Sequence, residues 1–381
     1  MNRPTHVSVA VDATPLLGVR TGIGVFVHEL VRALAGLREP DPGLDLRAYA
    51  VTWRGRRGLT AAVPAGVGAG HLPMPARPLR ELWKRTDFPP LEWWTGAVDV
   101  VHGTNFVVPP TRHAARMVTV HDLTAWRFPE LVAPASRDFP ALVERAVRTG
   151  AAVHVNSRSV GDEVEAEFGV APERVRVVYP GVPPVVRGDA GRGRALAGSD
   201  RYVLALGTVE PRKDLPGLVA AFDAVAATVT GVRLVVAGPD GWGTPAYEAA
   251  VAAAAHRDRV VRLGYVGDRD RADLLAGATL FGYPSVYEGF GFPPLEAMTC
   301  GTAVVATRAG AVPEVCGDAA ALVDVGDVDG LAEVMGSLLG DDTARAALVA
   351  AGREHVLRFS WETCAREMAA VYGALCPRTS R

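Results

Sequence analysis

The sequence predicts an α/β protein with two doubly wound, Rossmann-like domains, each built on a parallel sheet. Three observations favour this fold class. Short runs of β-branched residues alternate with segments of helical period, as in strands joined by crossover helices. A chain of 381 residues is too long for one ordinary core. Residues 181–200 are rich in Pro, Gly and Arg and lack an apolar period, which is typical of a linker.

The expected strands form two sets, one in each half of the chain. We therefore expect an N-terminal domain over residues 1–183 and a C-terminal domain over 198–360, facing each other across a cleft. A last helix over 361–376 has one apolar stripe and could pack on either domain, with the N-terminal domain as our first expectation. The strands are expected near 7–11, 46–51, 99–102, 117–121, 152–155 and 175–179, and then near 202–206, 232–237, 259–263, 279–283, 303–306 and 320–323.

Capping residues mark the starts of several expected helices. A glycine-rich turn at residues 21–24 leads into the first long helix. Ser157, Asp214 and Ser360 each precede an apolar helical stripe and are expected to be N-caps. These stripes predict faces that pack in the core and not functional sites.

Composition excludes several classes of protein. The formal net charge of −2 excludes the broadly basic surface with which proteins grip nucleic acids. The four cysteines lack zinc-site spacing, and we interpret them as reduced thiols. No apolar run reaches the length of a signal-peptide core or a membrane span. We therefore expect a soluble, cytoplasmic protein without a nucleic-acid partner.

The segment EGFGFPPLE, residues 288–296, is the strongest local signal. Glu288 and Glu296 bracket a glycine-rich turn that follows an expected strand. The glycines let the backbone approach a ligand, and the proline pair starts a helix. The free N–H groups at that helix start favour an anion such as a phosphate, with Glu296 in the first turn. In a purely structural interpretation, Glu296 complements the helix dipole and Glu288 is a solvated loop residue.

Arg212 and Lys213 form a second signal. They follow a strand that ends near Gly207 and precede the helix that Asp214 is expected to cap. Doubly wound sheets place ligands at this end of a strand. Adjacent guanidinium and ammonium groups can neutralise a diphosphate without a metal. Their placement favours this interpretation over an exposed pair of surface charges.

A third signal is the segment VTVHDL, which predicts His121 and Asp122 at the ligand-facing end of a strand. An imidazole there can hydrogen-bond a ligand hydroxyl or tune the charge near a reaction centre. His102 and Asn105, which follow another expected strand, are further candidates on the same side of the sheet.

Together these motifs resemble glycosyltransferase family 4, a group of retaining enzymes with the GT-B fold. The resemblance rests on TGIGVFVHEL, VTVHDL, GTVEPRKDLPGLVAAF and EGFGFPPLEAMTCGTAVVATRAGAVPEV, which occur in the family's order and span nearly the whole chain. The glutamate pair with seven residues between its members is specific to the family pattern when Arg212 and Lys213 accompany it. The resemblance implies a bacterial enzyme of polysaccharide biosynthesis that transfers a hexose with retention at the anomeric carbon.

The resemblance also implies roles for individual residues. Arg212 and Lys213 hold the donor diphosphate, and Glu296 binds the ribose hydroxyls. Glu288 lies against the donor sugar and His121 faces the reacting sugar, so these two join the cations as expected catalytic residues. The expected donor-binding residues are Gly22, Gly24, Gly207, Arg212, Lys213, Val266, Glu288, Gly289, Phe290, Gly291, Phe292, Leu295 and Glu296.

Donor and acceptor are not fixed by these motifs. Resemblance to mannosyltransferase-like members makes GDP-mannose the first expectation, followed by UDP and dTDP sugars. The acceptor is expected to be a glycan, a lipid-linked molecule or a small molecule, with Asn105 and Asp122 on its side of the site. Residues 77–94 interleave basic and aromatic side chains and could rest on the inner face of a membrane. The preferred interpretation of this stretch is a helix packed by its leucines and tryptophans.

We expect no cofactor and no metal. Many sugar transferases hold a divalent ion with an Asp-x-Asp pair, and Asp327 and Asp329 have that spacing. They stand ahead of an expected helix, however, where aspartates most simply supply an N-cap and first-turn charge. Metal-independent chemistry is therefore favoured.

Three other functions share parts of this pattern. A nicotinamide dehydrogenase is disfavoured because no Gly-x-Gly-x-x-Gly follows the first strand. A nucleotide-sugar epimerase or hydrolase of the same fold would need no acceptor, and it stays open. A non-catalytic nucleotide-sugar-binding protein is disfavoured because a silent binder has no need of both glutamates and both cations.

Overall fold

The computed structural model describes residues 6–18, 22–38, 43–70, 72–132 and 136–376. The chain divides into two compact units, which are described separately here as unit 1 and unit 2. Unit 1 comprises residues 1–183 and 359–381, and unit 2 comprises residues 184–358. The last helix, α16 (Trp361–Leu375), thus belongs to unit 1, and unit 2 begins before residue 198.

Unit 1 is built on a seven-stranded parallel sheet with the order β3-β2-β1-β4-β5-β6-β7. The edge strand β3 was missed by the sequence pattern because its two residues, Gly68 and Ala69, are not β-branched. The strands are β1 (His6–Asp12), β2 (Gly43–Tyr49), β3 (Gly68–Ala69), β4 (Val100–Gly103), β5 (Ala115–Val120), β6 (Ala152–Val155) and β7 (Val175–Val177).

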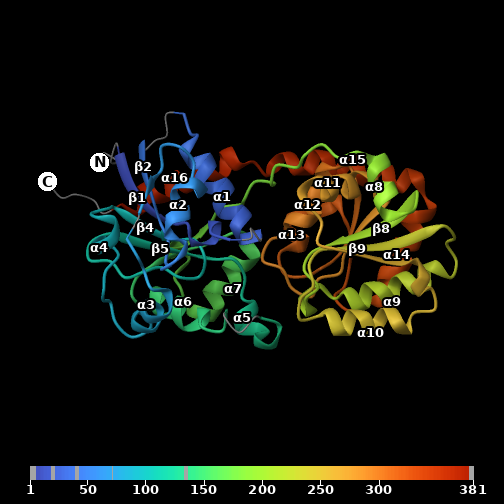
Figure 1. Ribbon diagram of the computed structural model, residues 1–381, viewed down its shortest axis with the longest axis horizontal. Helices are drawn as coiled ribbons and strands as arrows, with labels where there is room; N and C mark the ends of the chain where they lie inside the picture. The colour runs from blue at the N-terminus through green and yellow to red at the C-terminus, as the bar shows by residue number, and fades with distance from the viewer. Residues whose placement is uncertain (1–5, 19–21, 39–42, 71, 133–135, 377–381) are drawn as a thin grey trace. The chain divides into compact units, whose positions relative to one another are not determined.

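Helices cover both faces of this sheet (Figure 1). On one face α1 packs against α16, which Ser360 caps as expected by accepting a hydrogen bond from the Thr363 N–H at 3.1 Å. Ser157 caps α7 in the same way through the Val160 N–H. The helices are α1 (Gly22–Ala35), α2 (Leu59–Ala62), α3 (Ala76–Trp83), α4 (Glu92–Thr95), α5 (Thr124–Arg127), α6 (Phe139–Arg148), α7 (Arg158–Phe168) and α16.

Unit 2 is built on a six-stranded parallel sheet with the order β10-β9-β8-β11-β12-β13. All six strands expected in this half of the chain are present, which confirms the predicted fold class. They are β8 (Arg201–Leu206), β9 (Val232–Ala237), β10 (Val260–Gly264), β11 (Leu280–Tyr283), β12 (Ala303–Thr307) and β13 (Ala321–Val323).

The helices of unit 2 also cover both faces of its sheet. Helices α9, α10 and α14 lie on one side and α8, α11 and α12 on the other (Figure 1). Throughout the described part of the chain, no helix has both the length and the apolar character needed to cross a bilayer. The helices are α8 (Ala190–Ala197), α9 (Leu215–Ala226), α10 (Thr244–Ala253), α11 (Asp268–Gly277), α12 (Phe292–Thr299), α13 (Val312–Cys316), α14 (Val328–Gly340) and α15 (Asp342–His355).

Helix α8 corrects the prediction that residues 181–200 form a linker. Asp189 caps the helix, accepting hydrogen bonds from the backbone N–H groups of Gly191 and Arg192. The helix packs on α11 so closely that a Cβ at Gly193 would lie 1.9 Å from the carbonyl oxygen of Asp273. Because this contact face uses glycine instead of large apolar side chains, no apolar period marks the helix in the sequence.

Candidate functional site

The strand order of unit 2 reverses between β8 and β11, which are neighbours in the sheet. Sheets of this kind bind ligands beyond the carboxyl ends of their strands at the point of reversal. The segment after β8 carries Arg212 and Lys213, and the segment after β11 carries Glu288. The two strongest sequence signals therefore meet at one place.

Backbone geometry shapes the turn after β8. Gly207 has φ +143°, a conformation that side chains rarely allow. A short helical turn, Pro211–Lys213, follows and presents both cations. Asp214 then caps α9 as expected, accepting a hydrogen bond from the Gly217 N–H at 3.1 Å.

The loop after β11 is held against that turn through its backbone. The Val286 N–H donates to the carbonyl of Arg212 at 2.9 Å, and the Ala311 N–H donates to the carbonyl of Glu288 at 2.8 Å. The Thr307 hydroxyl donates to the carbonyl of Ser285. These bonds fix the backbone from which the Glu288 side chain extends.

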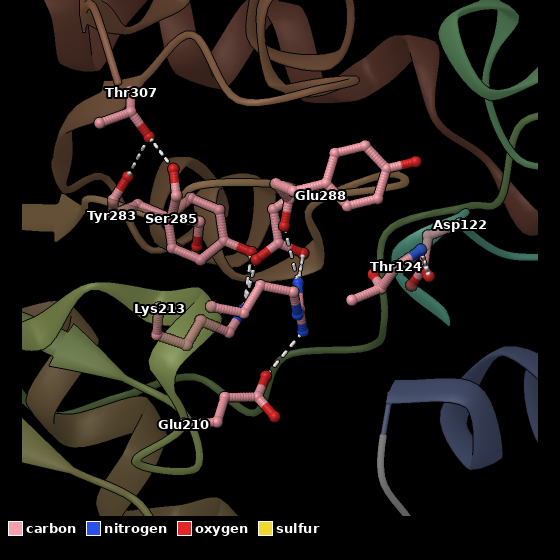
Figure 2. Close-up of polar contacts among 10 residues, drawn as sticks. Asp122, Thr124, Glu210, Lys213, Tyr283, Ser285, Glu288 and Thr307 are labelled. Atoms are coloured by element: carbon pink, nitrogen blue, oxygen red, sulfur yellow. Dashed lines mark hydrogen bonds and ion pairs between the residues drawn. The ribbon is translucent and has the colours of Figure 1, made fainter. Parts of the chain in front are cut away.

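The side chains of the two segments form one charged cluster (Figure 2). Glu288 places Oε2 2.6 Å from Nη1 of Arg212 and Oε1 2.6 Å from Nζ of Lys213. The ammonium of Lys213 also donates to the Tyr283 hydroxyl at 3.0 Å and lies 4.7 Å from the centre of that ring. Glu210 accepts from Nη2 of Arg212 at 2.7 Å. Two cations thus face two carboxylates.

Burial and charge act in opposite directions on these groups. Burial alone would raise the pKa of Glu288, but the charges of Arg212 and Lys213 outweigh it and lower the pKa to about 2. Burial lowers the pKa of Lys213, and the attraction of Glu288 opposes that shift. Burial also raises the pKa of Tyr283 well above its ordinary value. Glu288 is therefore a carboxylate at neutral pH, unsuited to act as a general acid.

Glu296 lies on α12, and its ion-pair partner is not one of the residues of this cluster. It forms an ion pair with Arg271 of α11, and burial raises its pKa while Arg271 opposes the rise. Because α12 begins at Phe292, Glu296 is its fifth residue and lies in the second turn, which corrects the expected first-turn position. The neighbouring Leu295 is completely buried, as a core residue would be.

Other expected donor-binding residues surround these two glutamates. Gly291 has φ +111° and directly precedes α12, which explains the need for glycine there. The rings of Phe290 and Phe292 meet edge to face at 5.2 Å between centroids. Val266 is half-buried just after β10. Their contacts with a donor stay predictions.

In unit 1, His121 follows β5 and is buried, with both ring nitrogens engaged. Its Nε2 lies 2.8 Å from the carbonyl oxygen of Thr104, which can only accept, so this nitrogen donates. Its Nδ1 lies 3.0 Å from Nδ2 of Asn156 and accepts a hydrogen bond from that amide. Burial lowers the pKa of His121. The ring is therefore neutral and oriented, and a bond to a sugar hydroxyl would replace one of these two contacts.

The acceptor-side candidates lie near the ends of adjacent strands in unit 1. Asp122 accepts a hydrogen bond from the Thr124 N–H at 2.9 Å. The side-chain oxygen of Asn105 is buried and has no hydrogen-bond partner. Burial raises the pKa of Asp12, at the end of β1, to about 6. Polar side chains therefore lie at the strand ends where the acceptor side of the site is expected.

Several other expectations of the sequence are revised. Helix α1 begins at Gly22, so Gly22 and Gly24 lie within the helix instead of in a preceding turn, and Thr21 lies outside the described residues. His102 is completely buried between Tyr372 and Thr119, in a structural position.

The Asp-x-Asp pair has the structural role that the sequence favoured. Asp327 caps α14, accepting a hydrogen bond from the Gly330 N–H at 2.8 Å. Asp329 lies in the first turn of the same helix, where its charge complements the helix dipole.

The basic and aromatic stretch 77–94 only partly matches its preferred interpretation. Leu79 and Trp83 are buried in the core, as expected. In contrast, Leu82, Phe88 and Trp93 are 39%, 52% and 51% exposed. Contact of this stretch with a membrane stays a prediction, to be tested by flotation with anionic liposomes.

Sequence patterns missed four residues that complete these sites. Glu210 and Tyr283 hold the two cations, Arg271 holds Glu296, and Asn156 orients His121. Asn156 directly follows β6 and Glu210 lies in the turn after β8, and these positions could have marked them. Arg271 lies on α11, a different helix from Glu296, and no sequence motif marks it as a site residue.

Comparison with known proteins supports the family resemblance and the fold. A family model described as "Glycosyl transferases group 1" matches residues 191–355, and one described as "Glycosyltransferase Family 4" matches residues 20–185. Among solved structures, sucrose-phosphate synthase from Thermosynechococcus elongatus aligns with a TM-score of 0.73 at 20% identity, covering 97% of this chain and 99% of that one. Anabaena HepE in complex with UDP and glucose aligns with a TM-score of 0.68 at 17% identity, covering 97% and 100%.

Three curated relatives are similar in sequence. O-antigen chain mannosyltransferase B of Escherichia coli is 38% identical over 46% of this chain and 46% of its own length. The MMP alpha-(1->4)-mannosyltransferase of Mycolicibacterium hassiacum is 35% identical over 57% and 52%. The chain therefore spans about half the length of these two relatives. A D-inositol 3-phosphate glycosyltransferase of Segniliparus rotundus is 30% identical over 78% of this chain and 69% of its own length. This coverage, together with family models that match both units, shows that the chain belongs to glycosyltransferase family 4 and has the GT-B fold.

Proposed function

We propose that this chain is a retaining glycosyltransferase that moves a hexose from a nucleotide-diphosphate sugar to an acceptor hydroxyl. The observation that carries the proposal is the meeting of Arg212, Lys213 and Glu288 at the strand reversal of unit 2. Doubly wound sheets bind nucleotides at this place. Two adjacent cations there match the charge of a diphosphate.

The two cations act on the leaving group. As the bond between the anomeric carbon and the donor phosphate oxygen breaks, negative charge develops on the diphosphate. Arg212 and Lys213 stabilise that charge while the sugar passes through an oxocarbenium-like state. The acceptor oxygen bonds to the same face of the anomeric carbon, and its proton passes to the leaving diphosphate.

Glu288 does not serve as a covalent nucleophile in this mechanism. Without donor, its pKa is about 2 and each of its oxygens accepts from a cation; with donor bound, we expect those oxygens to accept from hydroxyls of the sugar. A nucleophile needs a lone pair that is not so strongly stabilised. We therefore assign Glu288 to contacts with the donor sugar and leave the diphosphate as the base.

GDP-mannose is the first donor to test. Two relatives, at 38% and 35% identity, are described as mannosyltransferases. Another relative is named for D-inositol 3-phosphate, so a polyol phosphate joins glycans and lipid-linked molecules as an acceptor to test. The HepE complex contains UDP and glucose, which makes UDP-glucose the second donor.

A thermal-shift screen followed by an assay of turnover tests the proposal. A nucleoside diphosphate that binds the folded chain raises its unfolding temperature by mass action, whereas NAD is expected to leave it unchanged. We expect GDP, UDP or dTDP to raise it, and the matching sugar donor to be consumed faster when an acceptor is present. No shift with any of the three, and no turnover of their hexose donors, would refute the proposal.

Products formed with and without acceptor distinguish transfer from the remaining alternative. An epimerase or hydrolase would convert the donor equally well in both cases. Anomeric configuration, measured by NMR on the transferred sugar, tests retention.

We further propose that the reaction needs no divalent metal and takes place in the cytoplasm. Arg212 and Lys213 can supply the positive charge that a metal provides in other transferases. Turnover in EDTA is expected to equal turnover in Mg²⁺. The four cysteines are free thiols, which supports a reducing compartment.

A further inference from the structure

The carboxylate of Glu288 is bound to the same two cations that the proposed function assigns to the donor diphosphate. One of its oxygens lies 2.6 Å from Arg212 and the other lies 2.6 Å from Lys213. Two oxygens of a phosphate would take the same arrangement on an adjacent guanidinium and ammonium. Glu288 and a diphosphate would therefore compete for the same two cations.

The cluster has no spare positive charge for a second anion. Glu210 occupies the other amino group of Arg212 at 2.7 Å, so two carboxylates balance two cations. Glu288 is 7% exposed, and the side chains of Arg212 and Lys213 are 18% and 14% exposed. Water screens charges poorly in such a place, and an arriving diphosphate repels Glu288 strongly. Binding of the diphosphate thus requires the carboxylate to move.

That movement falls to the Glu288 side chain. Its backbone is enclosed, because a Cβ at Gly310 would lie 2.3 Å from the Glu288 carbonyl oxygen. After rotation, Arg212 keeps its bonds to Glu210 and to the carbonyl of Tyr287, and Lys213 keeps its bond to the Tyr283 hydroxyl. The cations therefore stay in position while the carboxylate leaves them.

We propose that Glu288 is a built-in competitor of the diphosphate and leaves Arg212 and Lys213 readily only when it can bind the hydroxyls of the donor sugar. This inference rests on the proposed function. An intact donor supplies hydroxyls that donate to the displaced carboxylate, whereas the nucleoside diphosphate left after transfer supplies none there. The carboxylate then returns to the cations and promotes release of the product. Glu288 thus makes the site prefer donor over product.

Calorimetric titration of matched variants tests this inference. Glu288→Gln keeps the side-chain shape and removes the charge. Glu333→Gln, at an exposed position on α14, changes the net charge by the same amount and serves as the control. The probes are whichever of GDP, UDP and dTDP binds the unmodified chain most tightly, its hexose donor in the absence of acceptor, and inorganic pyrophosphate.

We expect Glu288→Gln to bind the nucleoside diphosphate and pyrophosphate about tenfold more tightly, with a smaller gain for the intact donor. Glu333→Gln should bind all three as the unmodified chain does. A folded Glu288→Gln protein that binds the nucleoside diphosphate no more tightly would overturn the inference. If this variant does not fold, Glu288→Asp, whose shorter side chain reaches both cations less well, should show a smaller tightening, and an unchanged affinity overturns the inference.

The same titrations distinguish failure of this inference from failure of the proposed function. If the unmodified chain binds none of the three nucleoside diphosphates, both are overturned. If it binds one of them and the loss of the Glu288 charge brings no tightening, only the competition is overturned.

Discussion

The hydroxyl of Tyr372, on the last helix of the chain, lies 2.7 Å from Nδ1 of His102, on a central strand of unit 1. This bond belongs to a buried series of hydrogen bonds in which the donor and the acceptor of each bond can be assigned. The carbonyl of Val178 can only accept, so His154 donates to it from Nε2. Burial lowers the pKa of His154 to about 3, so the ring is neutral and its Nδ1 accepts from the Thr119 hydroxyl. The Thr119 oxygen then accepts from His102 Nε2, and His102 Nδ1 accepts from Tyr372. Both imidazoles are neutral in this arrangement.

Removal of the Tyr372 hydroxyl should destabilise unit 1. Tyr372→Phe leaves a buried acceptor on His102 without its donor, and we expect a loss of about 1–3 kcal/mol in the free energy of unfolding. Urea unfolding followed by tryptophan fluorescence measures this, because every tryptophan except Trp242 lies in unit 1. Tyr265→Phe, at a residue 71% exposed, is the matched control and should change nothing. Equal midpoints for the two variants would contradict the assigned series of hydrogen bonds.

Acid should weaken unit 1 through the same histidines. Burial lowers the pKa of His154 to about 3 and that of His102 well below its ordinary value. In the unfolded chain both take up a proton near pH 6.5, whereas the folded unit excludes it, so stability is complete above pH 6.5 and falls as the pH drops below it. The slope is up to about 1.4 kcal/mol per pH unit for each histidine. The measurement is the urea midpoint of tryptophan fluorescence between pH 7.5 and 4.5.

Asp12 tests the direction in which acid changes the stability of unit 1. Burial raises its pKa to about 6, so the folded unit binds this proton more readily than the unfolded chain between pH 6 and 4. That uptake opposes the loss caused by the histidines. Asp12→Asn should therefore make the acid-induced loss steeper, while a midpoint that rises on acidification in the unmodified chain would reverse the argument.

The architecture could be read from sequence because its signals are local. Short runs of β-branched and other apolar residues predict every strand of unit 2, and the caps at Asp214 and Ser360 are visible as single residues before apolar stripes. The position of Arg212 after one strand and Glu288 after another predicted two parts of one site. Parallel sheets bring such strand ends together, so sequence spacing was enough.

The missing parts depend on contacts between distant residues. The sequence of helix α8 resembles a linker because Gly193 packs the helix against a backbone carbonyl, and such a contact leaves no apolar pattern. Pairing of Glu288 with Arg212 joins residues whose charges could equally have faced solvent. The family resemblance implies that Glu288 contacts the donor sugar, but it does not indicate that the carboxylate also binds the two cations.

Lys213 should be essential for turnover. The Tyr283 hydroxyl holds its ammonium in place when Glu288 moves away, so Lys213→Ala is expected to lower kcat about 10²–10³-fold without unfolding the chain. Lys84→Ala is the matched control, since Lys84 is the other lysine of the chain and pairs with Glu81 and Asp138 in unit 1. Steady-state kinetics with the preferred donor measure the effect. Near-normal turnover in a folded Lys213→Ala protein would remove this residue from the mechanism.

Glu296 should recognise the ribose and not the phosphates. Hydrogen bonds from ribose hydroxyls to a buried carboxylate contribute more than bonds to a neutral amide, so Glu296→Gln should weaken binding of the nucleoside diphosphate about tenfold or more. Pyrophosphate, which has no ribose, should bind the variant as tightly as before. Calorimetry with both ligands separates these effects. Equal weakening of both would instead indicate that the pair with Arg271 shapes the whole site.

His121 should stay neutral over the working pH range, with Asn156 as the residue that positions it. Its Nδ1 accepts from the Asn156 amide while Nε2 donates to Thr104, and burial lowers its pKa further. The pH profile of kcat should therefore lack a histidine ionisation near pH 6.5. Asn156→Asp places a carboxylate beside Nδ1, which favours the imidazolium and raises the pKa of His121. We expect the pH profile of kcat for this variant to gain an ionisation at higher pH, and the double variant with His121→Gln to lose it. The contrary result is an ionisation near pH 6.5 in the unmodified enzyme that disappears in His121→Gln alone. That result would show that the ring titrates freely.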